Sequence, residues 1–320
     1  MVKISSLGDV VHALPAISDI AASGGEWSID WVCEEAFAGI PAMHGAVARV
    51  IPCAFRRWRG KWTGLAARAE FAAFRSALRA TDYDIVLDLQ GLIKSALIAR
   101  LARGERHGFD WRSAREPLAC LAYSRRHAVG WGQHAIARNR MLAGAALGTP
   151  CEGPLRYGLT VAPARNVNDP YAVVLHATSR ADKLWPEQDW RALLAELSSR
   201  GMRTLLPWGS DAERARSTRL AVGIAGASVP DRMPAGDLAA LFSGAAAVVG
   251  VDTGLAHLAA AVGVPTVCIF TTTNPDLTGV QGERAVAINL GGNGAAPDAA
   301  AVIRTVGQLI DEAGTGGNAR

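Results

Sequence analysis

The stretch from Ala246 to Phe270, AAVVGVDTGLAHLAAAVGVPTVCIF, constrains the fold more than any other part of the chain. It predicts a buried strand over 246–251, a short helix over 255–262 and a second apolar strand after Pro265. Short apolar runs on either side of a helix, bounded by Gly and Pro, are typical of a parallel β-α-β unit. The chain is therefore expected to have an α/β fold built on parallel sheets.

The turn inside this unit carries polar residues where the first strand ends, Asp252-Thr253-Gly254, and His257 follows one turn into the helix. Free amide groups at a helix start, together with the helix dipole, favour an anion and most often a phosphate. Thr253 adds a hydroxyl, and Gly254 lets a ligand approach the backbone closely. The same residues also suit ordinary helix capping, so this turn alone leaves both interpretations open.

The length of 320 residues allows two α/β domains, each with its own core. Strand and helix patterns alternate up to about residue 147 and restart at Tyr171. The segment 148–170 between them holds four prolines and little periodicity, which indicates a linker. We therefore expect two Rossmann-like doubly wound domains, 1–160 and 161–320, facing a central cleft.

The expected elements of the first half begin with a strand over residues 2–5 that is shorter than usual. Asp82-Tyr83-Asp84 matches the DxD triplet of metal-dependent sugar transferases but precedes its strand, so we interpret it as a turn. The other expected strands are 27–33, 47–51, 85–89, 171–176 and 203–206, and the expected helices are 10–22, 65–79, 187–199 and 237–242, with one more starting after Gln90.

Cysteine use and the chain start favour a cytoplasmic protein. The five cysteines form no CxxC pair and are odd in number, which favours reduced thiols over disulfides or a zinc site. Cys268 lies inside an apolar strand and is expected to be a small buried hydrophobe. The first residues, MVKISSLGDVVHALPA, lack the continuous apolar core of a signal peptide, and apolar runs stay short of the ~20 residues that span a bilayer.

The net charge of +4 is unevenly distributed. Residues 1–165 hold 21 Lys and Arg against 14 Asp and Glu, and residues 166–320 hold 12 against 15, so the halves carry +7 and −3. The basic half includes the cluster FRRWRGKW at 55–62. Such a half implies an anionic partner, namely nucleic acid, an acidic membrane or a phosphorylated substrate, unless it is simply a solvated arginine-rich surface.

Polar side chains follow several predicted strands. Ser5-Ser6-Leu7-Gly8-Asp9 forms one strand-to-helix turn, in which Asp9 is either a site carboxylate or a charge at a helix start. In the second half, residues 176–186 supply Thr178, Ser179 and Lys183. Trp208 and Glu213 follow the next strand and suit a nucleoside, with Met233 as a further wall or as packing. These turns converge on a nucleotide site, although no GxGxxG or Walker A sequence is present.

Four stretches occur in the same order in glycosyltransferases that use ADP-heptose, which this chain resembles over essentially its whole length. They are SSLGDVVHALP at 5–15, DLQGLIKS at 88–95, HATS with KLWP within 176–186, and VDTGLAH at 251–257. FRRWR at 55–59 and AREPLA at 114–119 resemble one branch of that family.

The resemblance implies a GT-B fold and an inverting transfer that forms an α-linked heptose. Its donor would be ADP-L-glycero-β-D-manno-heptose, bound by the carboxyl-terminal domain. Its acceptor would be a Kdo residue of Kdo2-lipid A, bound by the amino-terminal domain at the anionic inner leaflet of the cytoplasmic membrane. The alternative is heptosyltransferase II or another transferase of this family with a different acceptor. A nucleic-acid partner is not expected, because the interleaved aromatic residues of such modules are missing.

The resemblance also implies residue roles. Asp9 corresponds to the catalytic base, Lys183 to a phosphate or sugar contact, Glu213 to a ribose contact and Asp252 to a residue that holds the heptose. The predicted donor-binding residues are Thr178, Ser179, Lys183, Trp208, Glu213, Met233, Asp252, Thr253, Gly254 and His257. The predicted acceptor-binding residues are Ser6, Gly8, Arg56, Arg57, Arg59, Gln90 and Arg115.

This chemistry agrees with what the residues indicate on their own. Inversion in one displacement needs a base on the acceptor hydroxyl and stabilisation of the departing diphosphate. Lys183, the amides at 253–255 and His257 are donors for that charge. The site is therefore expected to need no obligatory cofactor and no metal ligand set, although Mg²⁺ stimulation is compatible with it.

Overall fold

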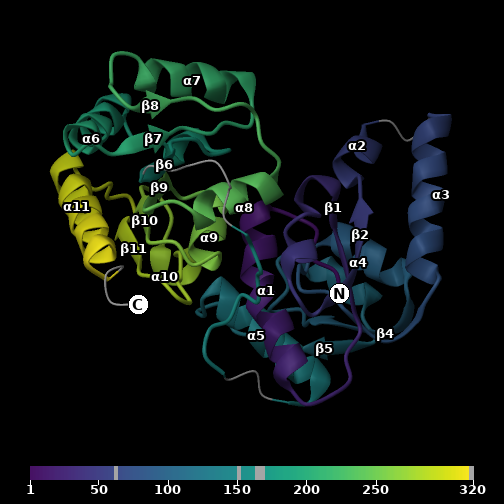
Figure 1. Cartoon of the computed structure of the whole chain (residues 1–320). Coiled ribbons are helices and arrows are strands. Elements are labelled where there is room, and N and C mark those ends of the chain that lie inside the picture. The colour runs from purple at the N-terminus through teal and green to yellow at the C-terminus, as the bar shows by residue number, and fades with distance from the viewer. Residues whose placement is uncertain (61–63, 150–152, 163–169, 317–320) are drawn as a thin grey trace. The chain divides into compact units, whose positions relative to one another are not determined.

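The computed structural model describes residues 1–60, 64–149, 153–162 and 170–316. The chain divides into two compact units, Met1–Thr160 and Val161–Arg320, with the boundary where the sequence placed it (Figure 1). The strands and helices that the apolar periodicity predicted occur in the predicted order. The cysteines among the described residues, Cys33, Cys53, Cys120 and Cys268, are free and buried, and Cys151 lies outside this part of the chain.

The strands of the first unit form two parallel groups. One group consists of β1 (Ile29–Glu34) and β2 (Val47–Cys53), and the other of β3 (Asp82–Leu87), β4 (Arg103–Phe109) and β5 (Arg125–His127). The helices of this unit are α1 (Leu7–Ala22), α2 (Phe55–Arg59), α3 (Leu65–Arg79), α4 (Ile93–Leu101) and α5 (Ala135–Leu147), with short 3₁₀ helices η1 (Glu35–Phe37), η2 (Pro41–Met43) and η3 (Pro117–Ala122).

The segment Met1–Ile4 is too short to count as a full strand, yet it joins β1 to β3. The Val2 amide donates to the Leu87 carbonyl at 2.8 Å, and the Lys3 amide donates to the Val32 carbonyl at 3.1 Å. Val2 forms parallel bridges with both neighbours. With this segment included, the spatial order is β2-β1-(1–4)-β3-β4-β5, which is the 3-2-1-4-5-6 order of a Rossmann sheet.

The second unit repeats that order with a complete sheet. Its strands are β6 (Tyr171–Leu175), β7 (Arg203–Leu205), β8 (Ala227–Ser228), β9 (Ala247–Val251), β10 (Thr266–Phe270) and β11 (Ala287–Gly291). They pair in the order β8-β7-β6-β9-β10-β11, and every pairing is parallel. The helices are η4 (Ala181–Lys183), α6 (Glu187–Ser199), α7 (Asp211–Ala221), α8 (Ala235–Ser243), α9 (Gly254–Ala261), α10 (Pro275–Thr278) and α11 (Ala299–Gly316).

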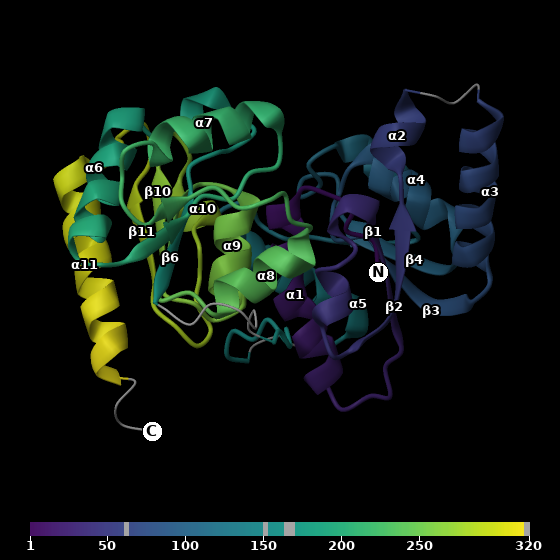
Figure 2. The same ribbon diagram turned by 45° about the horizontal axis from the view of Figure 1, so that its top comes forward.

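The core of the second unit explains the long apolar runs of its strands. All residues of β6, β9 and β10 are buried, as expected where helices cover both faces of a parallel sheet. In Figure 2, α6 and α11 lie on one side of this sheet and α8 and α9 on the other. Trp190 of α6 and Val306 of α11 pack in one cluster with Val249 of β9. Cys268 in β10 is fully buried, which confirms its predicted role as a small hydrophobe.

Several predicted boundaries differ from the structure. Helices α3 and α6 have the predicted bounds, but Asp82–Asp84 open β3 and do not form a turn. Tyr83 is held in the strand by its hydroxyl, which donates to the Asp30 carboxylate at 2.7 Å. The predicted linker is also too long at its start, because Tyr157 and Leu159 are buried in the first unit.

Acid should destabilise the fold through His176, which is fully buried after β6. Burial lowers the pKa of His176 from 6.5 to about 4, so the unfolded chain binds a proton at a higher pH than the folded one. The stability that the neutral ring provides is complete above about pH 6.5 and is lost as the pH falls toward 4, by up to about 3 kcal/mol. Urea unfolding of wild type and His176→Gln across this range should show a flatter pH profile for the variant. Parallel profiles would contradict the assignment.

Candidate active site

The carboxyl ends of β6, β9 and β10 bring three side chains of the second unit onto the carboxylate of Asp252 and a fourth onto its backbone carbonyl. Lys183 Nζ lies 2.5 Å and Thr273 Oγ1 lies 2.6 Å from Asp252 Oδ2, and His257 Nε2 lies 3.8 Å from Asp252 Oδ1. The Thr178 hydroxyl donates to the Asp252 carbonyl at 3.1 Å. Since β6 and β9 are the neighbours at which the strand order reverses, this cluster lies at the topological switch point, where α/β sheets bind ligands.

Asp252 is ionised at neutral pH. Burial by itself would raise its pKa, but hydrogen bonds from His257, Lys183 and Thr273 outweigh burial and hold the pKa well below its usual range. The carboxylate in turn fixes the Lys183 ammonium group, whose side chain is only 16% exposed. The arrangement therefore presents one oriented cation at the strand ends, together with a carboxylate and hydroxyls.

The helix that follows Asp252 has the geometry of an anion-binding turn. Thr253 is the N-cap residue of α9 in an extended conformation, and its side chain makes no capping hydrogen bond within the described chain. Gly254 is the first helical residue, so the first amides of α9 start beside the Asp252 cluster. His257 is buried and bound to Asp252, which makes it a support of the cluster as much as a ligand contact.

The remaining predicted donor residues lie at the ends of β6, β7 and β8. Trp208 is half-buried, its ring nitrogen donates to the Pro230 carbonyl at 2.8 Å, and the Arg214 guanidinium lies 5.2 Å from its ring centre. Glu213 accepts hydrogen bonds from the Gly209 and Ser210 amides and so caps α7. Met233 is half-buried and Ser179 is exposed. These residues are placed on the same edge of the sheet as Asp252.

Asp9 lies at the corresponding switch point of the first unit. It is the third residue of α1, and its carboxylate accepts from the Ser6 amide at 2.6 Å and the Ser6 hydroxyl at 3.0 Å. Gly8 is buried beside it in the first turn of α1. The Ser6 and Asp9 pair is thus a capping box, which holds the carboxylate in one position at the carboxyl end of the first strand.

A cavity of about 160 Å³ opens beside Asp9. Of the predicted acceptor residues, Gln90 and Arg115 line it with Asp9. Gln90 is not free to bind a ligand through its whole amide, because its Oε1 accepts from the Ile4 and Ser5 amides at 2.8 and 3.1 Å. It joins the first strand to the loop after β3.

Two cations in this cavity were not predicted from the sequence. Lys3 Nζ donates to the Leu89 carbonyl at 2.7 Å and to Asn139 at 3.2 Å, and burial lowers the pKa of Lys3. The Arg138 guanidinium lies 3.8 Å from the Trp131 ring centre, and its buried Nε has no hydrogen-bond partner among the described residues. Lys3 could have been noticed in the sequence as a lysine inside an apolar strand. Arg138 gave no such signal, because it reaches the cavity from α5.

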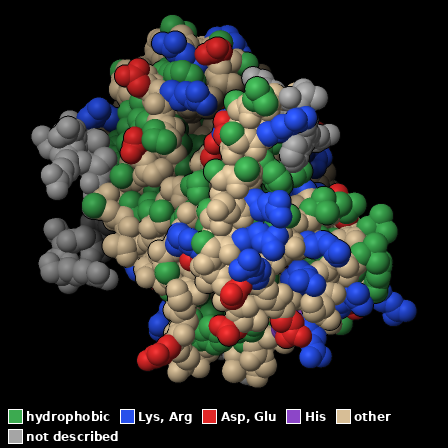
Figure 3. Space-filling view, turned by 90° about the vertical axis from the view of Figure 1, so that its right-hand side faces the viewer, with side chains coloured by type: hydrophobic (Ala, Val, Ile, Leu, Met, Phe, Trp, Pro, Cys, Tyr) green, Lys and Arg blue, Asp and Glu red, His purple; other side chains and the backbone are tan. Residues whose placement is uncertain are grey.

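The predicted arginine cluster at 55–59 lies after β2 and outside that cavity. Arg57 pairs with Glu35 at 3.0 Å and Glu70 at 2.6 Å, so both of these carboxylates offset its charge. The Arg56 guanidinium lies 5.3 Å from the Phe37 ring centre. The side chain of Arg59 lies outside what the structure describes, as does Trp62. Figure 3 shows Lys and Arg side chains gathered on one face, with hydrophobic side chains near them.

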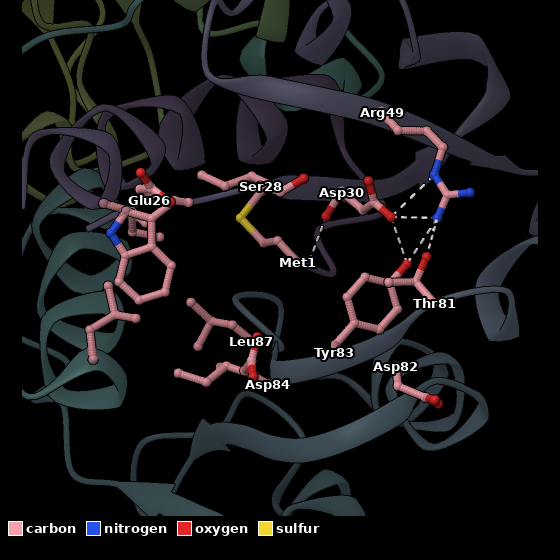
Figure 4. Close-up of a pocket in the computed structure, with 15 residues that line it drawn as sticks. Met1, Glu26, Ser28, Asp30, Arg49, Thr81, Asp82, Tyr83, Asp84 and Leu87 are labelled. Atoms are coloured by element: carbon pink, nitrogen blue, oxygen red, sulfur yellow. Dashed lines mark hydrogen bonds and ion pairs between the residues drawn. The ribbon is translucent and has the colours of Figure 1, made fainter. Parts of the chain in front are cut away.

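A larger cavity, about 620 Å³, lies at the opposite edge of the same sheet (Figure 4). It is lined by the amino ends of β1, β2 and β3, away from Asp9. Its main polar side chains bind one another: Arg49 donates to Asp30 and, at 3.2 Å, to Tyr83. This network orders the amino ends of the strands and provides none of the predicted site residues.

Three further features of the described chain bear on function. No group of three or more His, Cys, Asp or Glu side chains within residues 1–60, 64–149, 153–162 and 170–316 is arranged to hold a metal ion. Over the same ranges, no helix combines the length and apolar character needed to cross a bilayer. Trp58 is only 3% exposed and is no stacking platform for a base.

Two Rossmann sheets in tandem, one with a carboxylate and one with a cation and helix start at its switch point, fit the class of GT-B glycosyltransferases. Residues 71–304 match the family model for glycosyltransferase family 9 (heptosyltransferase). The chain is 46% identical over 295 residues to lipopolysaccharide heptosyltransferase 1 of Salmonella typhimurium, covering 90% of this chain and 92% of the relative. It is 47% identical over 290 residues to the Escherichia coli K12 protein of the same name, covering 88% and 90%.

Solved structures agree with these relatives. E. coli heptosyltransferase WaaC with ADP superimposes with a TM-score of 0.89 at 44% identity, over 96% of this chain and 98% of that one. WaaC with ADP-2-deoxy-2-fluoro heptose gives a TM-score of 0.83 at 43% identity, over 97% and 98%. The chain belongs to glycosyltransferase family 9 and is a glycosyltransferase with a GT-B fold.

Removing the cation from the donor-side cluster should destabilise the second unit. Lys183→Met removes the positive charge that offsets the Asp252 carboxylate. We expect the free energy of unfolding to fall by about 1–3 kcal/mol at pH 7, which is less than the cost of breaking a fully buried pair. Because the pKa of Asp252 is depressed in the folded state, this contribution is present above about pH 4 and fades as the pH falls further. In denaturant titrations, the difference in unfolding free energy between wild type and variant should therefore be smaller at pH 3 than at pH 7, and should disappear only at still lower pH, where Asp252 is protonated in the folded protein. An equal difference at both pH values would contradict the ion-pair account.

Proposed function

We propose that this glycosyltransferase moves heptose from ADP-L-glycero-β-D-manno-heptose to a Kdo residue of Kdo2-lipid A, with inversion at the anomeric carbon. The observation that carries the donor side is the Asp252 cluster at the switch point of the second unit, next to the start of α9. Relatives that share nearly half of their residues with this chain, including one whose solved structure holds an ADP-heptose analogue, support the same donor.

Bond cleavage at the anomeric carbon places growing negative charge on the diphosphate. Lys183 and the first amides of α9 are fixed donors for that charge, and fixed donors are commonly the largest contribution to catalysis. Asp252 accepts from Lys183 and Thr273, which leaves a carboxylate beside the cation to position sugar hydroxyls. We propose that the reaction has no obligatory cofactor and that Mg²⁺ is at most a stimulator.

On the acceptor side we propose Asp9 as the base that takes the proton of the attacking hydroxyl. Ser6 holds its carboxylate in place, and Lys3, Arg115 and Arg138 supply positive charge around the same cavity. These cations match an acceptor that carries carboxylate and phosphate groups. Arg56, Arg57 and Arg59 remain further candidates for those groups, and no nucleic-acid partner is proposed.

The acceptor assignment implies that the enzyme works at the cytoplasmic face of the inner membrane, as a peripheral protein. The basic character of the amino-terminal half supports that location, since anionic lipid surfaces attract clusters of Lys and Arg. A sister enzyme such as heptosyltransferase II would use the same donor with an acceptor that already carries heptose. Competition between Kdo2-lipid A and its heptosylated form distinguishes the two, and preference for the heptosylated form would contradict our proposal.

Asp9→Asn should lower kcat for heptose transfer by about 10²-fold or more, because Asn keeps a hydrogen-bond acceptor for Ser6 but cannot take a proton. Binding of ADP should not change, since the proposed donor residues all belong to the second unit. Asp84→Asn is the matched control, because it makes the same change at an exposed carboxylate on the other edge of the same sheet. It should retain wild-type kcat. Undiminished transfer by Asp9→Asn would remove Asp9 from the proton step.

A further inference from the structure

Exposed large hydrophobic side chains are concentrated in one segment of the first unit. Half of those found among the described residues come from residues 93–131. They are Ile93, Leu97, Trp111, Leu118, Leu121 and Trp131, with exposures between 41% and 64%. Single exposed apolar side chains are ordinary, but a concentration of them indicates an interaction surface.

The 3₁₀ helix η3 directs two leucines outward. Residues three apart in a 3₁₀ helix lie on the same side, and Leu118 and Leu121 are 62% and 64% exposed. The residues between them, Ala119 and Cys120, are buried, so η3 is anchored by its small side chains. A folded domain does not need large apolar groups on the outer side of such an anchored turn.

Helix α4 packs against η3 and likewise carries large apolar side chains on its exposed side. Its outward positions 93, 97 and 100 follow helical spacing and are occupied by Ile, Leu and Arg. The Ile93 amide donates to the Glu116 carboxylate at 2.7 Å, which fixes the start of α4 beside the start of η3. Two neighbouring elements therefore each expose a pair of branched aliphatic side chains.

Exposed arginines belong to the same segment as these four side chains. Arg100, Arg112, Arg115, Arg125 and Arg126 are all exposed in the same segment, in which Glu105 and Glu116 are the exposed carboxylates. Arg125 pairs with Glu105 at 2.8 Å. The Arg126 guanidinium lies 5.8 Å from the ring centre of Trp111, and its Nε donates to the Cys120 carbonyl at 2.9 Å. The resulting surface combines apolar side chains with excess positive charge and aromatic rings.

This surface is continuous with the proposed acceptor cavity. Arg115 lines the cavity beside Asp9 and precedes Leu118 by three residues. The loop that carries Arg115 follows β4, and α4 follows β3, so both start from the carboxyl edge of the sheet, where Asp9 lies. An acceptor whose sugar enters the cavity can thus keep its lipid portion on the side of η3 and α4.

We propose that Ile93, Leu97, Leu118 and Leu121, with the exposed arginines of the same segment, dock on an anionic phospholipid bilayer. The aliphatic side chains enter the acyl boundary, and the arginines remain at the headgroups. Charge complementarity selects this occupant over a second copy of the chain, because two such faces would bring like charges together. The inference relies on the proposed function only for the position of the acceptor, and lipid binding itself is independent of transfer.

The test is co-sedimentation of the full chain with vesicles of phosphatidylglycerol and phosphatidylethanolamine that contain no acceptor. Leu118→Ser with Leu121→Ser should weaken partitioning about tenfold or more, because burial of one leucine changes a partition constant by that order. Val222→Ser removes a side chain of the same 64% exposure from the second unit and should leave partitioning unchanged. Arg100→Gln with Arg112→Gln should weaken binding severalfold at low salt, whereas Arg304→Gln in α11 should not.

Transfer to a water-soluble, deacylated acceptor separates this inference from the proposed function. The double leucine variant should transfer heptose to that acceptor at the wild-type rate and lose activity only on vesicle-bound acceptor. Equal vesicle binding by wild type and the leucine variant, with transfer intact, would overturn the docking surface alone. Concentration-dependent dimerisation that the leucine substitutions abolish would also overturn it, by showing that a second copy covers the face.

Discussion

The order of parallel strands determines where this enzyme can perform chemistry. Each unit has the order 3-2-1-4-5-6, so the loops after its first and fourth strands diverge at a switch point. Asp9 follows the first strand of one unit, and Asp252 follows the fourth strand of the other. A parallel sheet places all such loops on one edge, which is why residues far apart in sequence, such as Lys183 and Thr273, reach a single carboxylate.

Local sequence patterns were sufficient for what depends on local physics. Helices α3 and α6 have the predicted bounds because their apolar spacing and termini are encoded within the segments themselves. The triplet at 82–84 was misassigned because what keeps Tyr83 in a strand is a contact with Asp30, 53 residues earlier. Short edge strands such as β5 and β8 give no periodicity to detect, and their existence depends on pairing with β4 and β7.

The candidate site shows the same division. Asp252, Thr253 and Gly254 were predictable because a strand end and a helix start are both visible in one short stretch. Thr273 was missed because a threonine after an apolar strand carries no signal until the neighbouring strand is known. Lys3 and Arg138 were missed for the same reason, since one is a buried lysine in a short strand and the other reaches the cavity from α5. Long-range pairing, not residue type, made these side chains functional candidates.

Several polar residues have a structural partner and a candidate function at once, so the two interpretations offered by the sequence were not exclusive. Glu213 caps α7, Asp9 caps α1, and Gln90 ties the first strand to the loop after β3. A capping hydrogen bond fixes a carboxylate without neutralising it, because the backbone amide contributes a dipole and not a charge. Such a carboxylate is held in one orientation, which the base that we propose needs before the acceptor hydroxyl arrives. The hydrogen bonds that begin these helices therefore also orient the carboxylates of the candidate site.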